Sequence, residues 1–208
     1  IGVKSVMMNM GQLKTDGIEV TLKVSPIYRP QDRFVWNISL NGTHAKSKYS
    51  KIGNRLQSMN EQNQANLNTT RYYDGGSPTD IWAVRSAGID PATGQDLFIK
   101  KDGTYTFTYD KNDEVVVGNT EPKLEGVLGT TLYYKGLSFG CYLRYRLGGQ
   151  VFNNALYEKV ENIDREGINY NQDKRALYDR WSTPGQEAKF KRISLFQTTE
   201  TSSRFVMD

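Results

Sequence analysis

The chain has 208 residues, which suits one domain or part of one, and no linker-like stretch divides it. Aromatic residues make up 12% of the chain, which is too much ring surface for a disordered protein. The 27 basic and 23 acidic residues are interspersed and leave a net charge of only +4. Because no dense basic block follows one face, the sequence predicts no nucleic-acid partner.

Cysteine content and hydropathy exclude further classes of protein. Cys141 is the only cysteine, so an internal disulfide and a cysteine-based zinc site are excluded. The mean hydropathy is -0.64 and no apolar run is long enough for a spanning helix. The strands of a membrane β-barrel alternate between apolar and polar residues, so the low mean hydropathy does not exclude a membrane β-barrel. The chain starts at Ile1 without a signal peptide, and we expect an internal segment of a longer protein.

The first periodic segments predict a hairpin of strands near 16–25 and 33–45. In the first strand, Ile18, Val20, Leu22 and Val24 alternate with polar residues. Pro26 and Pro30 interrupt the pattern, and a second alternating run begins at Phe34.

A second hairpin is predicted from strands near 122–134 and 137–152. Leu137, Phe139, Cys141, Leu143, Tyr145 and Leu147 share one face of its second strand. Only Lys135 and Gly136 separate the two strands, and glycine can supply the positive φ that so tight a turn requires. Gly126 and Gly129 loosen the first of these strands.

The connections between the predicted strands are unequal. Short turns close the hairpins, whereas the stretches near 46–120 and 153–204 are long, polar and rich in Gly and Asn. Short turns on one side and long loops on the other are typical of outer-membrane barrels. The fold class predicted is all-β: antiparallel transmembrane β-barrel strands, forming part of a barrel, with long extracellular loops.

Residues at the strand ends and on the polar face bear on the choice between a barrel and a soluble β-sandwich. Rings beside the strand ends resemble interfacial girdles, although Tyr is also a common strand residue; they are Tyr28, Tyr133, Tyr134, Phe152 and Tyr157. Arg144 and Arg146 on the polar face suit a wet lumen better than a dry second layer. Alternation alone fits a sandwich equally well.

Several phrases resemble segments of one family, the SusC/RagA group of TonB-dependent outer-membrane transporters of glycan- and peptide-scavenging bacteria. They follow the family's order over nearly the whole chain: NMGQLKTDGIEVTL (Asn9 to Leu22), SAGIDPATGQDLFIKKDG (Ser86 to Gly103), the strand-turn-strand from Val117 to Asn153, RWSTPG (Arg180 to Gly185) and TSSRFVMD (Thr201 to Asp208). One departure is Glu125-Gly126-Val127 in place of Gly-Gly-Phe, which we expect to change only local bending.

The resemblance implies that residues 1–208 belong to the β-barrel domain of a TonB-dependent receptor, in the outer membrane of a Gram-negative, Bacteroidetes-like bacterium. It implies outer-membrane lipid around the barrel, a SusD-like lipoprotein lid, and a TonB complex that acts through an N-terminal part absent from this chain. The imported substrate would be an oligosaccharide or a peptide. A few strands cannot close a barrel, so the segment should not be a stable membrane unit alone.

The sequence predicts no enzyme and no cofactor. His44 is the only histidine, and it and Cys141 suit structural roles better than catalytic ones. Asp110, Asn112 and Glu114 have a spacing that could bind calcium, but the loop lacks the glycine and bidentate glutamate of an EF-hand, which favours an ordinary acidic turn.

One loop carries candidate substrate-contacting residues. Tyr72, Tyr73, Asp74 and Trp82 place rings beside a carboxylate, as a sugar-binding surface requires. The alternative is that these rings pack the loop against its neighbours or a lid protein, and Trp181 is a weaker case of the same kind. The function predicted is import of an oligosaccharide or peptide; the alternatives are a soluble β-sandwich carbohydrate-binding module and, if an acid pair were present, a hydrolase.

Overall fold

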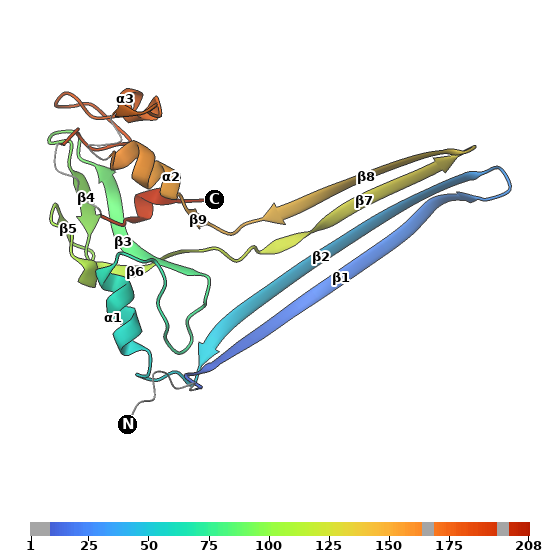
Figure 1. Cartoon of the computed structure of the whole chain (residues 1–208), viewed down its shortest axis with the longest axis horizontal. Helices are drawn as coiled ribbons and strands as arrows, with labels where there is room; N and C mark the ends of the chain where they lie inside the picture. Colours follow the sequence, from blue (N-terminus) through green and yellow to red (C-terminus); the bar gives the residue numbers. More distant parts are fainter. Residues whose placement is uncertain (1–8, 164–168, 195–199) are drawn as a thin grey trace.

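The computed structural model describes residues 9–163, 169–194 and 200–208. A long four-stranded sheet projects from a second part that contains a smaller sheet and short helices (Figure 1). Among the described residues, every pairing between two strands is antiparallel, and two isolated bridges are parallel, Val84 with Ser202 and Arg180 with Phe190. The fold is therefore all-β and antiparallel, with few helices.

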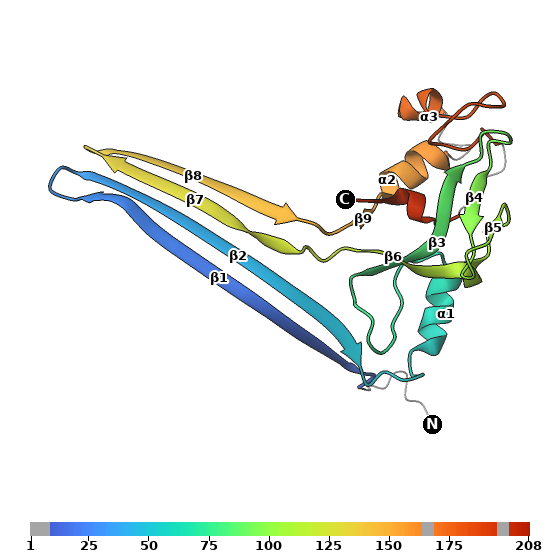
Figure 2. The ribbon, with the colours of Figure 1, turned by 180° about the vertical axis from the view of Figure 1, so that it is seen from behind.

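The long sheet has the strand order β1-β2-β7-β8. Its strands are β1 (Gln12–Arg29), β2 (Phe34–Ser50), β7 (Leu124–Tyr134) and β8 (Leu137–Leu147). The two hairpins join because β2 also pairs with β7, from Phe34 opposite Tyr134 to Thr43 opposite Glu125. Both tight turns lie at one end of this sheet and the long connections leave from the other end (Figure 2).

Local backbone conformation accounts for the ends of the strands. Lys135 and Gly136 both have positive φ, 48° and 95°, as a two-residue hairpin turn with the correct twist requires. The predicted role of Gly136 is thus confirmed. At the other end β8 stops at Leu147, not at 152, because Gly148 and Gly149 adopt φ of 70° and 86°.

The stretch near 46–120, predicted as a long loop, contains regular structure, because β2 continues to Ser50 and residues 80–119 form a second sheet. This sheet has the order β5-β4-β3-β6, with β3 (Asp80–Ile89) at its centre. The other elements in this stretch are α1 (Gln57–Ala65), β4 (Asp96–Ile99), β5 (Tyr105–Thr106), the short helix η1 (Lys111–Asp113) and β6 (Glu114–Asn119). Ile81, Ala83 and Val84 of β3 are buried and provide the apolar contacts of the sheet.

The C-terminal stretch packs a small apolar cluster against the second sheet. Its elements are β9 (Val151–Phe152), α2 (Asn154–Leu156), the π-helical turn η2 (Tyr157–Glu161), α3 (Arg175–Tyr178), η4 (Ser203–Phe205) and β10 (Val206–Met207). The buried members of the cluster are Leu156, Val160, Ala176, Phe190 and Phe205. Within the described ranges, none of the helices has the length and apolar character needed to cross a membrane.

Buried ion pairs tie these segments together. Arg204 bonds Asp96 of β4 at 2.9 Å and Glu161 of η2 at 3.0 Å, so one guanidinium holds three parts of the chain. Arg71 pairs with Glu114, and both side chains are less than a tenth exposed. Losing one partner of such a pair would leave an uncompensated buried charge.

Candidate functional site

One face of the long sheet is apolar across all four strands. The register places Leu22, Leu40, Leu128 and Leu143 in a single row from edge to edge. The rows nearer the tight turns hold Val24, Ile38, Thr130 and Cys141, then Ile27, Trp36, Leu132 and Phe139. Leu22 is 54% exposed and Leu143 is 61% exposed, so the described residues leave this face open. A contiguous apolar face of this kind marks contact with a membrane or a partner.

The polar side-chain atoms of Trp36, Thr130 and Tyr145 on this face are satisfied inside the sheet. Trp36 Nε1 donates to Thr130 Oγ1 at 2.8 Å, across the pair β2 and β7. The Tyr145 hydroxyl donates to the Asn41 carbonyl at 2.6 Å. Pairing of this kind matters most where no water is present to replace the lost hydrogen bond.

The opposite face of the sheet is polar. One row holds Lys23, Ser39, Gly129 and Tyr142, and another holds Thr21, Asn41, Val127 and Arg144. Arg144 is largely exposed and lies 3.8 Å from Glu125, while Arg146 donates to the Thr120 carbonyl. The sheet therefore separates an apolar surface from a polar one, as the wall of a membrane β-barrel does.

Tyrosine rings cover glycines on both faces. Gly126 faces Tyr145 in the register, and a Cβ on Gly126 would lie 1.9 Å from the Asn41 carbonyl oxygen. Gly129 faces Tyr142, whose ring would lie 2.8 Å from an added Cβ. These contacts explain why glycine occupies two positions in the middle of β7.

The aromatic residues near the tight turns divide between the two faces. Tyr134 lies on the apolar face and packs edge to face against Phe34, with ring centroids 5.4 Å apart. Tyr28 and Tyr133 both lie opposite Val35, on the other face. Only Tyr134 among these three tyrosines has the placement of a ring at the end of the apolar band.

The structure brings two of the four candidate substrate-contacting residues together. Tyr73 packs edge to face against Trp82 at 5.4 Å, and its hydroxyl donates to Asp80. Tyr72 instead packs against Tyr49 of β2, at 5.6 Å. The rings thus hold the loop to its neighbours, and their contact with substrate stays a prediction.

Asp74 has a structural partner of its own. Its carboxylate accepts the backbone N–H groups of Ile52 at 2.9 Å and Gly53 at 3.0 Å. These two hydrogen bonds lower the pKa of Asp74 below its ordinary value of 3.8. The carboxylate therefore anchors the chain where it leaves β2.

The acidic residues considered for calcium do not converge. Asp110 accepts from the Asn112 N–H and caps η1, whereas Glu114 turns inward to Arg71. Burial raises the pKa of Glu114 although Arg71 opposes that shift. Across residues 9–163, 169–194 and 200–208, no group of three or more His, Cys, Asp or Glu side chains is placed to hold a metal ion.

His44 and Trp181 also have partners within the chain. His44 Nδ1 donates to the Lys123 carbonyl at 2.8 Å, beside the end of the paired region. Trp181 Nε1 donates to the Pro91 carbonyl at 2.8 Å. Cys141 is exposed on the apolar face.

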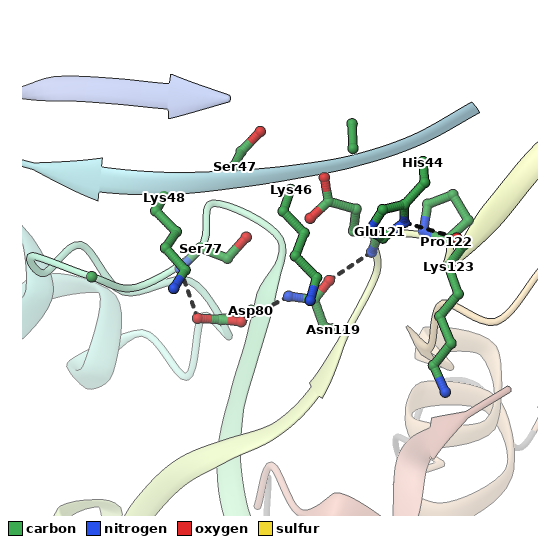
Figure 3. A pocket seen from close by; sticks show the side chains of 12 residues that line it. His44, Lys46, Ser47, Lys48, Ser77, Asp80, Asn119, Glu121, Pro122 and Lys123 are labelled. Carbon is green, nitrogen blue, oxygen red and sulfur yellow. Dashed lines mark hydrogen bonds between the residues drawn. The ribbon is translucent and has the colours of Figure 1, made fainter. Parts of the chain in front are cut away.

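A cavity of about 490 Å³ lies where the long sheet meets the second part (Figure 3). Residues 44–48 of β2 form one wall, and Asp80, Asn119 and Glu121 lie on the other side. Lys46 and Lys48 point across it toward Asp80 and Asn119 (Figure 3). Sequence reasoning missed this site because its members come from three distant segments; the only local signal was the change from apolar to basic residues along one face of β2.

No protein-family model matches the chain, and no curated protein does. Among solved structures, it is similar to the RagAB peptide importer in the "open-open" state, with a TM-score of 0.70 and 21% identity over 95% of this chain and 21% of that one. A structure of the RagAB peptide transporter gives 0.69 and 20% identity over 94% and 21% of the two chains. The "closed-closed" state gives 0.64 and 20% identity over 95% and 22%.

The chain thus spans about a fifth of the length of the chains it matches. At these identities the likeness establishes a shared fold, one that belongs to transporter structures. The similarity extends over both the long sheet and the second part, because nearly all of this chain is covered.

Proposed function

We propose that this chain is a segment of the barrel wall, with its external loops, of an outer-membrane importer of the SusC/RagA type. The observation that carries the proposal is the two-faced long sheet, which is polar on one side and apolar on the other, where the polar atoms of Trp36, Thr130 and Tyr145 are paired. Its edge strands β1 and β8 would pair with strands from the rest of the barrel, because a spanning sheet needs a closed edge.

The dimensions of the sheet agree with this proposal. β7 and β8 each have 11 residues. At about 3.3 Å per residue and a tilt of about 40°, such strands cover about 28 Å, close to the hydrocarbon thickness of a bilayer. β1 and β2 continue beyond this band and would carry the wall into the external space.

For the cargo, we propose a peptide over an oligosaccharide, since the solved structures of similar fold are described as a peptide importer. Transport would proceed by movement of the barrel's plug and external loops without bond chemistry. TonB would supply the force through the N-terminal part of the full protein. A SusD-like lipoprotein would close over the loops, and exposed Leu177, Tyr178 and Ile193 offer it an apolar surface.

Gene deletion tests the import role. Deleting the gene of the full-length protein should abolish growth on one peptide or glycan source, with growth restored by the wild-type gene. Unchanged uptake across a broad panel of both would contradict the proposal.

Whether residues 1–208 fold on their own without detergent distinguishes a barrel segment from a soluble carbohydrate-binding module. Residues 1–208 expressed without detergent should aggregate, because the apolar face lacks its lipid and both sheet edges lack partners. A monodisperse monomer that unfolds cooperatively, followed by far-UV circular dichroism and light scattering, would favour the binding module.

A further inference from the structure

The edge of β2 that faces β7 is left unpaired over a short stretch. Pairing with β7 ends where Thr43 lies opposite Glu125, although β2 continues to Ser50 and pairs with β1 along its whole length. On the same edge, Tyr49 N–H donates to the Gly76 carbonyl at 2.8 Å and the Tyr49 carbonyl accepts from Gly75 N–H at 2.9 Å. A gap of residues 44–48 therefore separates two paired parts of one edge.

Backbone alternation shows which groups face this gap. In an antiparallel strand, the N–H and C=O of every second residue point to the same side. The N–H and C=O of Tyr49 both bond to Gly75 and Gly76, on the side of β2 away from β1. By the same alternation, Ser47 and Ala45 present their N–H and C=O groups to the gap. Within the described residues, no strand pairs with Ala45 or Ser47 on this side.

The cavity of about 490 Å³ lies against these backbone groups, with Ala45 and Ser47 in its wall. Its volume falls within the range of known ligand pockets, about 300 to 1,000 Å³. Donors and acceptors that alternate at the repeat of a β-strand match the backbone of another extended chain, which can add to the edge as a further strand. The rings and hydroxyls of a sugar do not share that repeat.

The side chains around the cavity favour acidic residues in the added strand. Lys46 and Lys48 are exposed, and within the described part of the chain neither forms a salt bridge. Asp80 and Glu121 lie across the cavity, and Asp80 accepts from Ser77 N–H and from Asn119 Nδ2, both at 2.8 Å. Among the described residues, neither carboxylate forms a salt bridge with Lys46 or Lys48. The two ammonium groups are therefore available to a ligand.

We propose that the gap at residues 44–48 of β2 is a peptide site, at which a short extended segment with acidic side chains pairs with the backbone of Ala45 and Ser47. This inference rests on the proposed import of peptides and names the class of cargo that the site selects. Lys46 and Lys48 would set the preference for acidic over basic peptides, and binding should weaken with added salt.

The test uses the full-length protein in detergent and the probe acetyl-Thr-Glu-Val-Glu-Thr-amide, with affinity measured by calorimetry. Two analogues carry N-methyl groups on its odd or on its even residues. Only the analogue in which the methyl groups replace the N–H groups that face β2 should bind more weakly, by about tenfold for each hydrogen bond removed. Equal binding of both analogues would overturn the proposal, because recognition would then not use the strand edge.

Matched variants test the protein side of the same contact. Ser47→Pro removes the N–H that faces the gap and should weaken the probe about tenfold, whereas Ser47→Ala keeps the N–H and loses only the hydroxyl contact to Thr15. The N-methyl series gives an answer even if Ser47→Pro does not fold. Exchange-protected Ala45 and Ser47 amides in the peptide-free protein would overturn the proposal, since another segment would then cover the edge.

The outcomes also separate this inference from the import role. If Ser47→Pro binds the probe like the wild type while cells still import peptides, the site is refuted and the importer stands. If the full-length protein imports no peptide but binding shows the N-methyl alternation, the site stands and the import role is refuted.

Discussion

A charge placed on the apolar face should destabilise the protein far more than the same charge one residue away. Leu22 lies in the row with Leu40, and Leu40 is six residues from Phe34 at one end of the band and four from His44 at the other. At about 3.3 Å per residue these distances are about 20 and 13 Å, which places the row near the middle of the apolar band.

Leu22→Arg should therefore lower the free energy of unfolding by about 2 to 4 kcal/mol in lipid, the cost of arginine at the midplane of a barrel. That is a shift of about 30- to 800-fold in the equilibrium constant. Thr21→Arg is the matched control, because Thr21 lies on the polar face next to Lys23, and it should change stability by less than about 0.5 kcal/mol.

The assay is urea unfolding of the full-length protein in lipid vesicles, followed by tryptophan fluorescence. If Leu22→Arg and Thr21→Arg have equal and small effects on the free energy of unfolding, the apolar face does not contact lipid. An equally large loss for both variants would also contradict a lipid-facing sheet, since the two faces would then not differ in environment.

Two further predictions concern packing and buried charge. Gly126→Ala should cost about 1 to 3 kcal/mol in the same unfolding assay, because its Cβ would lie 1.9 Å from the Asn41 carbonyl oxygen, whereas Gly140→Ala, with its nearest atom at 3.7 Å, should be tolerated; equal losses would contradict the packing argument. Arg71→Met should cost about 3 to 5 kcal/mol at neutral pH by leaving Glu114 charged and buried. Burial raises the pKa of Glu114, so the folded state holds this proton more tightly than the unfolded chain. The loss in Arg71→Met should shrink as the pH falls through the folded-state pKa, and a pH-independent loss would refute this origin.

The alternation of apolar and polar residues predicted the long sheet well, because the period of two is a local property of the chain. Ile18 to Val24 and Leu137 to Leu147 lie on strands with the expected face apolar. The pairing of β2 with β7 brings Phe34 next to Tyr134. No local pattern specifies such a contact, so the sequence indicated two hairpins and not one sheet.

The second sheet escaped prediction for a different reason. Its strands are short, down to the two residues of β5, and the pairing of β3 shifts register with β6 between Ile81 and Trp82 and with β4 between Ser86 and Gly88. Short, irregular strands lack the sustained alternation on which sequence analysis depends. The stretch therefore looked like a polar loop.

Of the candidate substrate-contacting site, the sequence predicted the aromatic residues but not their contacts. The sequence singled out Tyr73 and Trp82, which the fold brings together, but it contained no signal that Tyr72 would contact Tyr49. The cavity beside β2 depends on where pairing with β7 ends, which is a property of register and of the path of the chain beyond Glu125.

Whether the apolar face of the long sheet contacts lipid can be measured from the surroundings of successive residues along β8 in the membrane. Two single-cysteine forms of the full-length protein are labelled with a nitroxide. One keeps Cys141, which is exposed on the apolar face, and the other carries Tyr142→Cys on the polar face with Cys141 replaced by serine. Paramagnetic resonance then compares collisions with oxygen, which concentrates in lipid, and with a water-soluble nickel chelate. We expect more collisions with oxygen at position 141 and more with nickel at position 142, with the same alternation from Leu137 to Leu147. Equal access of nickel to both positions would contradict a lipid-facing sheet.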